Sequence, residues 1–364
     1  MNAQMKTAAA ILHNRTANKT EFLPFAAYDY SDYTMVTTTA DGHYGYCLRK
    51  FSLLCCCNEE FVFGIPVVCR YFDNTFKELG PQISSVVFPD LAVHCCSRSN
   101  AAYMTVTLSP TEKVVKYIKV TNRRARAYKY NMSVCLSALY GSEPKWMYLV
   151  QLFEHYKLQD VTHFYVYIQE IDEYSHKLLL DYEDTGEAEL IYFDREDRRP
   201  VRDWQFVAVQ DCVGRSRHES EFVTLQDLDE LFMPAGNKTL LEYAREKMTG
   251  PVASIAVHPY IVVRTSNPPA MYEGQGALLQ HFPALIFTNS SGKTTKFRIK
   301  PMFIPEKVIA VLVHWIYLFE PGYVTYNSSM DEVFLLHYRD LLVDRFFEKY
   351  KDRLISFGPF TSRP

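Results

Sequence analysis

The sequence predicts an α/β fold in which a mostly parallel sheet with flanking helices follows a smaller β-rich domain. From residue 126 onward, strand-like runs alternate with segments of helical periodicity, which is typical of parallel strands joined by crossover helices. Before residue 126 the chain has short apolar runs separated by Gly, Pro, Asn and Asp, which is typical of β structure. We therefore expect a flexible segment at 1–25, a β-rich domain at 26–125 and an α/β domain at 126–364.

The β-rich domain is expected to contain several short strands and to end in a basic stretch, 121–129. Arg123-Arg124-Ala125-Arg126 within that stretch is interpreted as a solvated linker, because a net charge of −3 and the absence of a long basic run do not favour nucleic-acid binding. The strands are expected at 45–47, 61–66, 86–89 and 103–108.

The α/β domain begins with four expected strands and three helices in strict alternation. Apolar side chains at Trp146, Leu149, Val150, Phe153 and Tyr156, for example, recur at helical spacing. The strands are expected at 133–138, 163–168, 188–193 and 222–225, and the helices at 146–158, 174–185 and 204–216. Beyond Gly250 we expect a strand pair at 254–264, a Pro/Gly loop at 267–276, β structure at 296–318 and a helix at 332–353.

An acidic motif, Asp227-Leu228-Asp229-Glu230, follows the last of these strands directly. Two carboxylates at the C-terminal tip of a strand form a hard-oxygen site suited to Mg²⁺ or Mn²⁺, and ligands of such sheets bind beyond the strand ends. A metal at this position typically holds a diphosphate. The alternative is a solvated acidic turn, but the apolar runs on both sides favour a tip anchored in a core.

Glycosylation patterns and cysteines indicate a lumenal or secreted protein. Six of the 12 asparagines begin the acceptor pattern, and eight of the nine cysteines precede residue 136, which suggests disulfides there with one thiol left over. Cys212 stands apart from the other cysteines. Residues 1–25 contain no apolar run of anchor or signal-peptide length, so we expect an anchor to be missing from this chain. The asparagines are Asn14, Asn18, Asn131, Asn237, Asn289 and Asn327.

An ordered set of short motifs resembles glycosyltransferase family 92, over about Asn131 to Asp340. No single motif is specific to this family, but the set of motifs in this order is. They are Trp146 with Glu154-His155-Tyr156, His163-Phe164-Tyr165-Val166-Tyr167, Gln205 with Asp211-Cys212, Asp227-Leu228-Asp229-Glu230-Leu231-Phe232, Lys296–Pro301 with His314, and His337-Tyr338-Arg339.

The resemblance implies a GT-A-like (Rossmann-like) fold, a UDP-sugar donor, Mn²⁺ (or Mg²⁺) and a Golgi anchor of type II, with a β-rich segment ahead of the catalytic domain. It implies transfer of galactose in β linkage from UDP-galactose to a glycan, in animals to the core fucose of N-glycans. We therefore expect an inverting galactosyltransferase in the Golgi lumen or secreted. No nucleic-acid partner is expected, and membrane contact only through the anchor.

Metal and donor contacts are expected on four residues of this set. Asp227 and Asp229 are expected to hold the metal, directly or through water, with His337 returning to it. Arg339 is expected to pair with phosphate in bidentate fashion. For His337 and Arg339 the alternative is one ordinary histidine and one surface arginine in a regular element.

Further donor contacts are expected at Tyr140 and Lys296. Tyr140 ends the first strand, where a GT-A fold would seat uridine, and its ring is a candidate to stack on the base. Lys296 and the nearby Lys300 are candidates to reach phosphate, although lone lysines are usually solvated.

The substrate-binding candidates are Trp204, Gln205, Glu230 and His314. An aromatic face beside an amide suits a pyranose, but Trp204 could equally pack against the core, and His314 lies in an apolar run typical of a satisfied core histidine. Inversion needs a carboxylate that removes the acceptor proton, for which we propose Glu273 in the Pro/Gly loop.

Two other functions compete with this one. The first is the same mechanism with another donor such as UDP-GlcNAc, since sugar epimers differ by one hydroxyl. The second is a secreted, catalytically inactive carbohydrate-binding protein. The intact Asp-x-Asp and His-Tyr-Arg motifs favour an active enzyme.

Overall fold

The computed structural model describes residues 22–39, 64–125, 127–194, 201–291, 298–340 and 354–356. The chain divides into two compact units, Met1–Ala125 and Arg126–Pro364. None of the helices in the described ranges is both long enough and apolar enough to cross a bilayer.

The smaller unit is a seven-stranded sheet with the strand order β4-β3-β6-β7-β1-β2-β5. Strand β6 confirms the expected strand at 103–108, whereas 45–47 and 61–63 lie outside the described residues, and of 64–66 only Pro66 is in a strand. Only Val86 of the run 86–89 is in a strand. The first strand begins at Leu23, inside the segment expected to be flexible. The strands are β1 (Leu23–Asp29), β2 (Tyr33–Thr39), β3 (Pro66–Phe72), β4 (Ile83–Val86), β5 (Ala92–Cys96), β6 (Tyr103–Thr107) and β7 (Ile118–Asn122).

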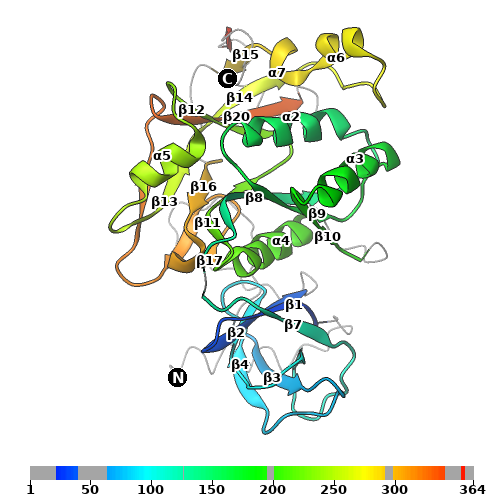
Figure 1. Ribbon diagram of the computed structural model, residues 1–364, viewed down its shortest axis with the longest axis vertical. Helices are drawn as coiled ribbons and strands as arrows, with labels where there is room; N and C mark the ends of the chain where they lie inside the picture. The colour runs from blue at the N-terminus through cyan, green and yellow to red at the C-terminus, as the bar shows by residue number, and fades with distance from the viewer. Residues whose placement is uncertain are drawn as a thin grey trace, which may run out of the picture. The chain divides into compact units, whose positions relative to one another are not determined.

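The larger unit is built on a second seven-stranded sheet, with the order β10-β9-β8-β11-β16-β13-β19. Its first four strands pair in parallel, as the alternating pattern predicted. Helices α2 and α3 lie on one side of this sheet and α4 on the other (Figure 1), because the chain reverses its direction across the sheet after β10. The elements are β8 (Tyr130–Leu139), α2 (Trp146–Lys157), β9 (His163–Ile168), α3 (Glu173–Asp184), β10 (Ala188–Tyr192), α4 (Val201–Ser216) and β11 (Ser220–Gln226).

The remaining three strands of this sheet come from the C-terminal half of the unit. Strand β16 is antiparallel to both β11 and β13, and β13 pairs in parallel with β19. Two strands, β17 and β18, form a separate antiparallel pair. The elements are β13 (Val252–Val257), β16 (Lys300–Phe303), η2 (Pro305–Lys307), β17 (Val308–Val311), β18 (Ile316–Phe319) and β19 (Val324–Asn327).

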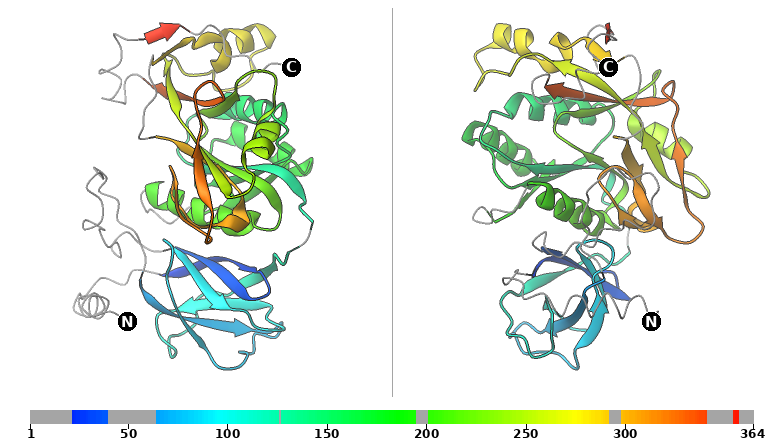
Figure 2. Two further views of the ribbon diagram at one scale, coloured as in Figure 1. Left: turned by 90° about the vertical axis from the view of Figure 1, so that its left-hand side faces the viewer. Right: turned by 180° about the vertical axis from the view of Figure 1, so that it is seen from behind.

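A five-stranded sheet with the order β12-β20-β14-β15-β21 completes the unit. The strands expected at 254–264 both exist, but β13 and β14 belong to different sheets, so they do not form a pair. The helix expected at 332–353 is wrong over its first part, because 333–340 is strand β20 between β12 and β14; residues 341–353 lie outside the described range. Strand β21 and helices α6 and α7 lie at one end of the unit (Figure 2). The elements are β12 (Glu230–Pro234), α5 (Leu240–Lys247), β14 (Pro259–Arg264), α6 (Gln275–His281), α7 (Pro283–Ile286), β15 (Asn289–Ser291), β20 (Val333–Asp340) and β21 (Leu354–Ser356).

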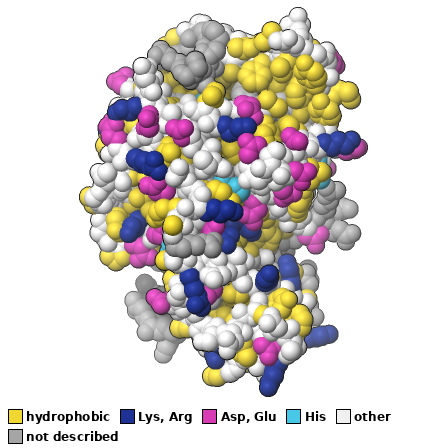
Figure 3. Space-filling model, in the orientation of Figure 1, with side chains coloured by type: hydrophobic (Ala, Val, Ile, Leu, Met, Phe, Trp, Pro, Cys, Tyr) yellow, Lys and Arg dark blue, Asp and Glu magenta, His cyan; other side chains and the backbone are white. Residues whose placement is uncertain are grey.

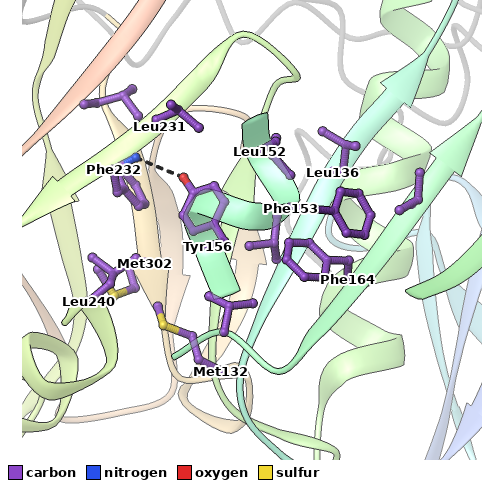
Figure 4. Packing of buried hydrophobic residues seen from close by; sticks show 14 of the residues in the cluster. Met132, Leu136, Leu152, Phe153, Tyr156, Phe164, Leu231, Phe232, Leu240 and Met302 are labelled. Atoms are coloured by element: carbon purple, nitrogen blue, oxygen red, sulfur yellow. Dashed lines mark hydrogen bonds between the residues drawn. The ribbon is translucent and has the colours of Figure 1, made fainter. Parts of the chain in front are cut away.

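Helix α2 fixes the start of β12 from within the core. The backbone N–H of Phe232 donates to the Tyr156 hydroxyl at 3.0 Å, and His155 Nε2 donates to the Phe232 carbonyl at 2.8 Å. Both aromatic side chains are buried, and Tyr156 lies among Leu152, Leu231 and their neighbours (Figure 4). Because both backbone groups of Phe232 are held, the acidic turn two residues earlier is anchored to the core.

Two disulfides and four exposed asparagines bear on the expected compartment. Cys69 pairs with Cys95 in the smaller unit, and Cys135 of β8 pairs with Cys212 of α4. Cys212 is therefore distant from Cys135 in sequence only. Cys96 is exposed and has no disulfide partner among the described cysteines. The acceptor asparagines that are described, Asn131, Asn237, Asn289 and Asn327, are all exposed.

Candidate active site

The acidic motif forms a tight turn between β11 and β12. The backbone N–H of Asp227 donates to Oε2 of Glu230 at 2.9 Å, and the N–H of Glu230 donates back to the Asp227 carbonyl at 3.1 Å. All residues of β11 except the half-buried Glu221 are buried, so the strand runs through the core and the acidic turn follows it directly. This tip lies at the edge where ligands of parallel sheets bind.

Lys300, the first residue of β16, lies inside this turn. Its Nζ is 2.8 Å from Oδ2 of Asp227 and 2.9 Å from Oε2 of Glu230, and its side chain is 1% exposed. Gln205 of α4 donates from Nε2 to the other oxygen of Asp227 at 3.1 Å. One side of the turn is therefore a closed network of protein donors and acceptors.

His337 of β20 reaches the other side of the turn because β20 pairs antiparallel with β12, with His337 opposite Glu230. Its Nε2 is 3.4 Å from Oδ2 of Asp229, and its Nδ1 is 3.3 Å from Oε1 of Glu230. Neither ring nitrogen makes a hydrogen bond to any described residue, although the side chain is buried. The N–H of Tyr338 donates to the Asp229 carbonyl at 2.8 Å and fixes the turn.

Burial and the charges in this cluster shift the pKa values of its carboxyl groups in opposite directions. Burial would raise the pKa of Asp227, but the charge and hydrogen bond of Lys300 outweigh it and hold the pKa at about 2. Burial likewise opposes ionisation of Asp229, but His337 lowers the pKa of that carboxyl. Burial raises the pKa of Glu230, which lies deepest. The Lys300 pKa is raised, because Asp227 and Glu230 outweigh its burial.

Tyr140 and Arg339 lie within electrostatic range of the acidic pair. Tyr140, the residue directly after β8, has its pKa raised by burial and then by the charges of Asp229 and Asp227. Arg339 lies two residues beyond His337 on the same strand, and its charge lowers the pKa of Asp229. The phenol ring of Tyr140 is half exposed, so it is open to a ligand at this edge.

A recess lies beside the turn, between the ends of β8 and β11 and helix α4. Its volume is about 260 Å³, including the space open to solvent. Gln205, Gln226, Asp227 and Lys300 supply polar groups to its wall, and Cys135 belongs to the same wall. Gln226 is fully buried, and its Oε1 makes no hydrogen bond to any described residue. The recess therefore lies at the strand ends, and its wall combines these polar groups with apolar side chains such as Leu136 and Val209.

Two of the expected substrate contacts, Trp204 and Glu230, are corrected by their burial, whereas a third, His314, is only partly buried. Trp204 is buried in the core with its ring stacked on Phe193 at 4.5 Å, so it does not offer a face to a sugar. Glu230 is fully buried against Lys300 and does not face a substrate. His314 is partly buried, and its Nδ1 donates to the Ile299 carbonyl at 3.2 Å.

Two further candidates are not brought to the cluster by the described contacts. Glu273 is exposed on the loop that precedes α6. That loop is held by Trp146, whose Nε1 donates to the Pro269 carbonyl at 2.8 Å, and by a hydrogen bond from the N–H of Tyr272 to the Tyr174 hydroxyl at 3.3 Å. Lys296 lies outside the described residues.

Sequence reasoning missed Gln226 as a member of the site, and it named Lys300 only as a candidate to reach phosphate, with a solvated lysine as the alternative. Lys300 is instead buried between Asp227 and Glu230. The available signal was its place at the head of the apolar run Pro301–Phe303, which is a buried strand. Gln226 is the last residue of β11 and directly precedes Asp227, so its position next to the motif was the available signal.

The possible metal ligands at this turn suit a divalent cation only in part. Among the described residues no three His, Cys, Asp or Glu side chains form a complete metal-binding group. Asp229 and His337 nevertheless fit, because a carboxylate oxygen and an unbonded imidazole nitrogen face one another, and Mn²⁺ accepts both ligand types. One or two protein ligands are also usual where substrate phosphates complete the coordination.

A polar turn at the carboxyl ends of parallel strands is typical of α/β proteins that bind their ligands at that edge. The sequence model of glycosyltransferase family 92 matches residues 130–364, which is more than half of the chain, and the chain belongs to this family. A curated relative, beta-1,4-galactosyltransferase galt-1 of Caenorhabditis elegans, is 31% identical over 121 residues. That match covers 32% of this chain and 28% of the relative, so the chain spans about a quarter of the length of the relative.

Two solved structures show partial similarity. The mannosyltransferase PcManGT from Pyrobaculum calidifontis, in complex with GDP-Man and Mn²⁺, has a TM-score of 0.33 at 13% identity over 62% of this chain and 61% of that chain. TarS 1-349 of S. aureus, in complex with UDP-GlcNAc, has a TM-score of 0.24 at 15% identity over 40% of this chain and 38% of that chain.

Proposed function

We propose that the protein is an inverting, metal-dependent galactosyltransferase that transfers galactose from UDP-galactose to a glycan acceptor, for example a fucose-bearing N-glycan. Family membership supports glycosyl transfer, and the name of the curated relative supports galactose as the sugar. The observation that carries the proposal is the pairing of Asp229 with His337 at the tip of β11, where a diphosphate would lie.

The metal, Mn²⁺ or Mg²⁺, would be held by Asp229 and His337, with Asp227 beside them. When bound, it neutralises the charge that builds on the departing diphosphate. The side chains of Asp227 and Asp229 are 29% and 27% exposed, so the turn is open to a ligand while its base is buried.

The donor would bind across this edge of the sheet. Tyr140 is proposed to stack on uracil, which its half-exposed ring supports. Arg339 is proposed to pair with phosphate, since its charge already acts on Asp229. Gln205 and Gln226 line the adjacent recess, and their amides suit hydroxyl groups of the donor. A contact between Lys296 and phosphate stays a prediction, because Lys296 lies outside the described residues.

The reaction transfers one glycosyl group with inversion at the anomeric carbon. The acceptor hydroxyl oxygen forms a bond to C1 of galactose, the bond from C1 to the phosphate oxygen breaks, and UDP leaves with that electron pair. A carboxylate takes the hydroxyl proton, and we assign this role to Glu273. Inversion of the α-linked donor gives the β linkage that the relative's name contains.

The acceptor is proposed to bind over the loop that carries Glu273. Met271 and Tyr272 are 54% and 51% exposed, and hydrophobic side chains gather on the molecular face over α6 and α7 (Figure 3). An exposed tyrosine ring beside a carboxylate offers an apolar face and an acceptor to a sugar ring. The half-buried His314, near Lys300, is a further candidate for the donor side.

A lumenal or secreted location is proposed, with the Golgi lumen as the first candidate. The two disulfides and the exposure of Asn131, Asn237, Asn289 and Asn327 support it, because disulfides persist in oxidising compartments and glycans need accessible asparagines.

The test of the metal role is Asp229→Asn, with the exposed Asp331→Asn as the matched control. We expect Asp229→Asn to lower kcat for UDP-galactose by about a thousandfold or more, since a metal ligand acts in the transition state. The melting temperature is expected to stay near that of the wild type. Full activity of Asp229→Asn would refute the metal role.

A further inference from the structure

Lys300 is a buried cation with two acidic partners. Its side chain is 1% exposed, and it comes from β16, which is antiparallel to the strand that carries the acidic turn. A lysine in such a place needs charged partners, and Lys300 has them in Asp227 and Glu230 at 2.8 and 2.9 Å. One positive charge therefore lies between two of the three carboxylates of the motif.

The oxygens of Asp227 are engaged by protein donors. Oδ2 accepts from Lys300, and Oδ1 accepts from Gln205 Nε2 at 3.1 Å. Glu230 Oε2 accepts from Lys300 and also from the backbone N–H of Asp227 at 2.9 Å. A divalent cation bound to Asp227 would have to displace these donors or lie beside a positive charge, and Coulomb repulsion opposes the second arrangement.

Asp229 lies on the other side of the turn, where the nearest basic group is an imidazole. His337 Nε2 is 3.4 Å from Asp229 Oδ2 and makes no hydrogen bond to a described residue. An unbonded ring nitrogen in a buried position is costly unless a ligand satisfies it. The two aspartates of one Asp-x-Asp motif therefore have different surroundings.

We propose that Lys300 is a positioning residue that holds Asp227 and Glu230 as its own ion-pair partners, so that the divalent cation is bound by Asp229 and His337 and not by Asp227. This inference rests on the proposed function, because it assigns roles within the same metal site. Lys300 would thereby supply, without a metal, the charge balance that two neighbouring carboxylates require.

The test measures Mn²⁺ affinity directly, from the electron paramagnetic resonance signal of free Mn²⁺ titrated with protein in the presence of UDP. Asp229→Asn is expected to weaken Mn²⁺ binding by about fiftyfold or more, and Asp227→Asn by about threefold or less. Asp331→Asn, an exposed site, is the control for both and should bind as the wild type does.

Lys300→Met tests the positioning role, with the exposed Lys113→Met as control. Loss of the cation removes the lysine partner that Asp227 and Glu230 share. Mn²⁺ should therefore bind at least about fivefold more tightly, while kcat falls and KM for the donor changes little. The double variant Lys300→Met/Glu230→Gln removes one charge of each sign. It should fold if the single variant does not, and should bind Mn²⁺ within about threefold of the wild type.

Equal losses of Mn²⁺ affinity in Asp227→Asn and Asp229→Asn would overturn this inference and leave the proposed function standing. Unchanged Mn²⁺ affinity in Lys300→Met would also overturn it. If only the double variant folds, a loss of Mn²⁺ affinity in that variant as large as the loss in Asp229→Asn would also overturn the inference. A wild-type protein that binds no Mn²⁺, with or without UDP, would overturn the metal-dependent function and this inference together.

Discussion

His155 makes the stability of the larger unit depend on pH, and its replacement by glutamine tests this. The ring is buried, 5% exposed, and its Nε2 donates to the Phe232 carbonyl at 2.8 Å. Burial, opposed only in part by that hydrogen bond, lowers the pKa of His155 to about 4. In the unfolded chain the pKa is about 6.5. The folded protein therefore binds fewer protons at this position than the unfolded chain does.

The sign and size of the effect follow from these two pKa values. Because the folded pKa is the lower one, the stabilisation is complete above pH 6.5 and is lost as the pH falls toward 4. The difference of about 2.5 corresponds to about 3 kcal/mol when fully expressed. Between pH 7.5 and pH 5 the loss from His155 alone is about 2 kcal/mol.

The assay is urea unfolding followed by tryptophan fluorescence at pH 7.5 and pH 5. The chain has three tryptophans, at positions 146, 204 and 315, so the signal reports on the larger unit. A glutamine in place of His155 can still donate to the Phe232 carbonyl but does not titrate. We expect His155→Gln to lose about 2 kcal/mol less than the wild type between the two pH values. His281→Gln, on α6, is the control and should behave as the wild type does.

The refuting result is a His155→Gln protein whose loss of stability on acidification equals that of the wild type. Some loss is expected to remain in the variant, because burial also lowers the pKa of His163 to about 4. The test is therefore the difference between His155→Gln and the wild type in the free energy of unfolding that each loses between pH 7.5 and pH 5.

Three other predictions concern catalysis, the disulfide and the compartment. Glu273→Gln should lower kcat by about a hundredfold or more with little change in KM for the donor; a wild-type rate would exclude Glu273 as the base. Cys212→Ala removes a cross-link to Cys135 across 77 residues and should lower the free energy of urea unfolding by about 4 kcal/mol; unchanged stability would show that this bond does not constrain the chain. Asn131→Gln, expressed through the secretory pathway, should lose one glycan by mass spectrometry, and an unchanged mass would show that Asn131 carries none.

The parallel part of the fold could be predicted because its elements have local sequence patterns. Strand β9 occupies the expected residues 163–168, and α2 differs from the expected helix by one residue at its end. Buried strands and amphipathic helices have short sequence periods, so their bounds need no knowledge of distant segments.

The strands beyond residue 250 depend on partners far away in the sequence and were predicted less well. Strand β20 was expected to be helical, because its apolar residues at Leu335, Leu336 and Tyr338 are also compatible with a helical period. Its actual partners are β12 and β14, about 100 and 75 residues earlier. Only the folded sheet makes this strand conformation the stable one.

The acidic motif of the candidate site could be predicted from the sequence, but the ion pairs inside the site could not. The sequence alone brings Asp227 and Asp229 to a strand tip, but no local pattern tells that Lys300 enters the turn or that Glu230 is buried. Trp204 is a similar case, since a tryptophan beside an amide is compatible with a sugar contact or with a core position, and the stacking on Phe193 decides for the core.

The most direct test of the central claim is UDP release from UDP-galactose, compared with other UDP-sugars, in the presence of Mn²⁺ or EDTA. We expect slow turnover of UDP-galactose that EDTA abolishes, and faster turnover when a glycan acceptor such as a fucose-bearing N-glycan is added. Turnover of another UDP-sugar in preference would contradict galactose as the transferred sugar. The absence of both UDP release with any glycan acceptor and thermal stabilisation by UDP with Mn²⁺ would contradict the enzyme assignment and favour a carbohydrate-binding protein.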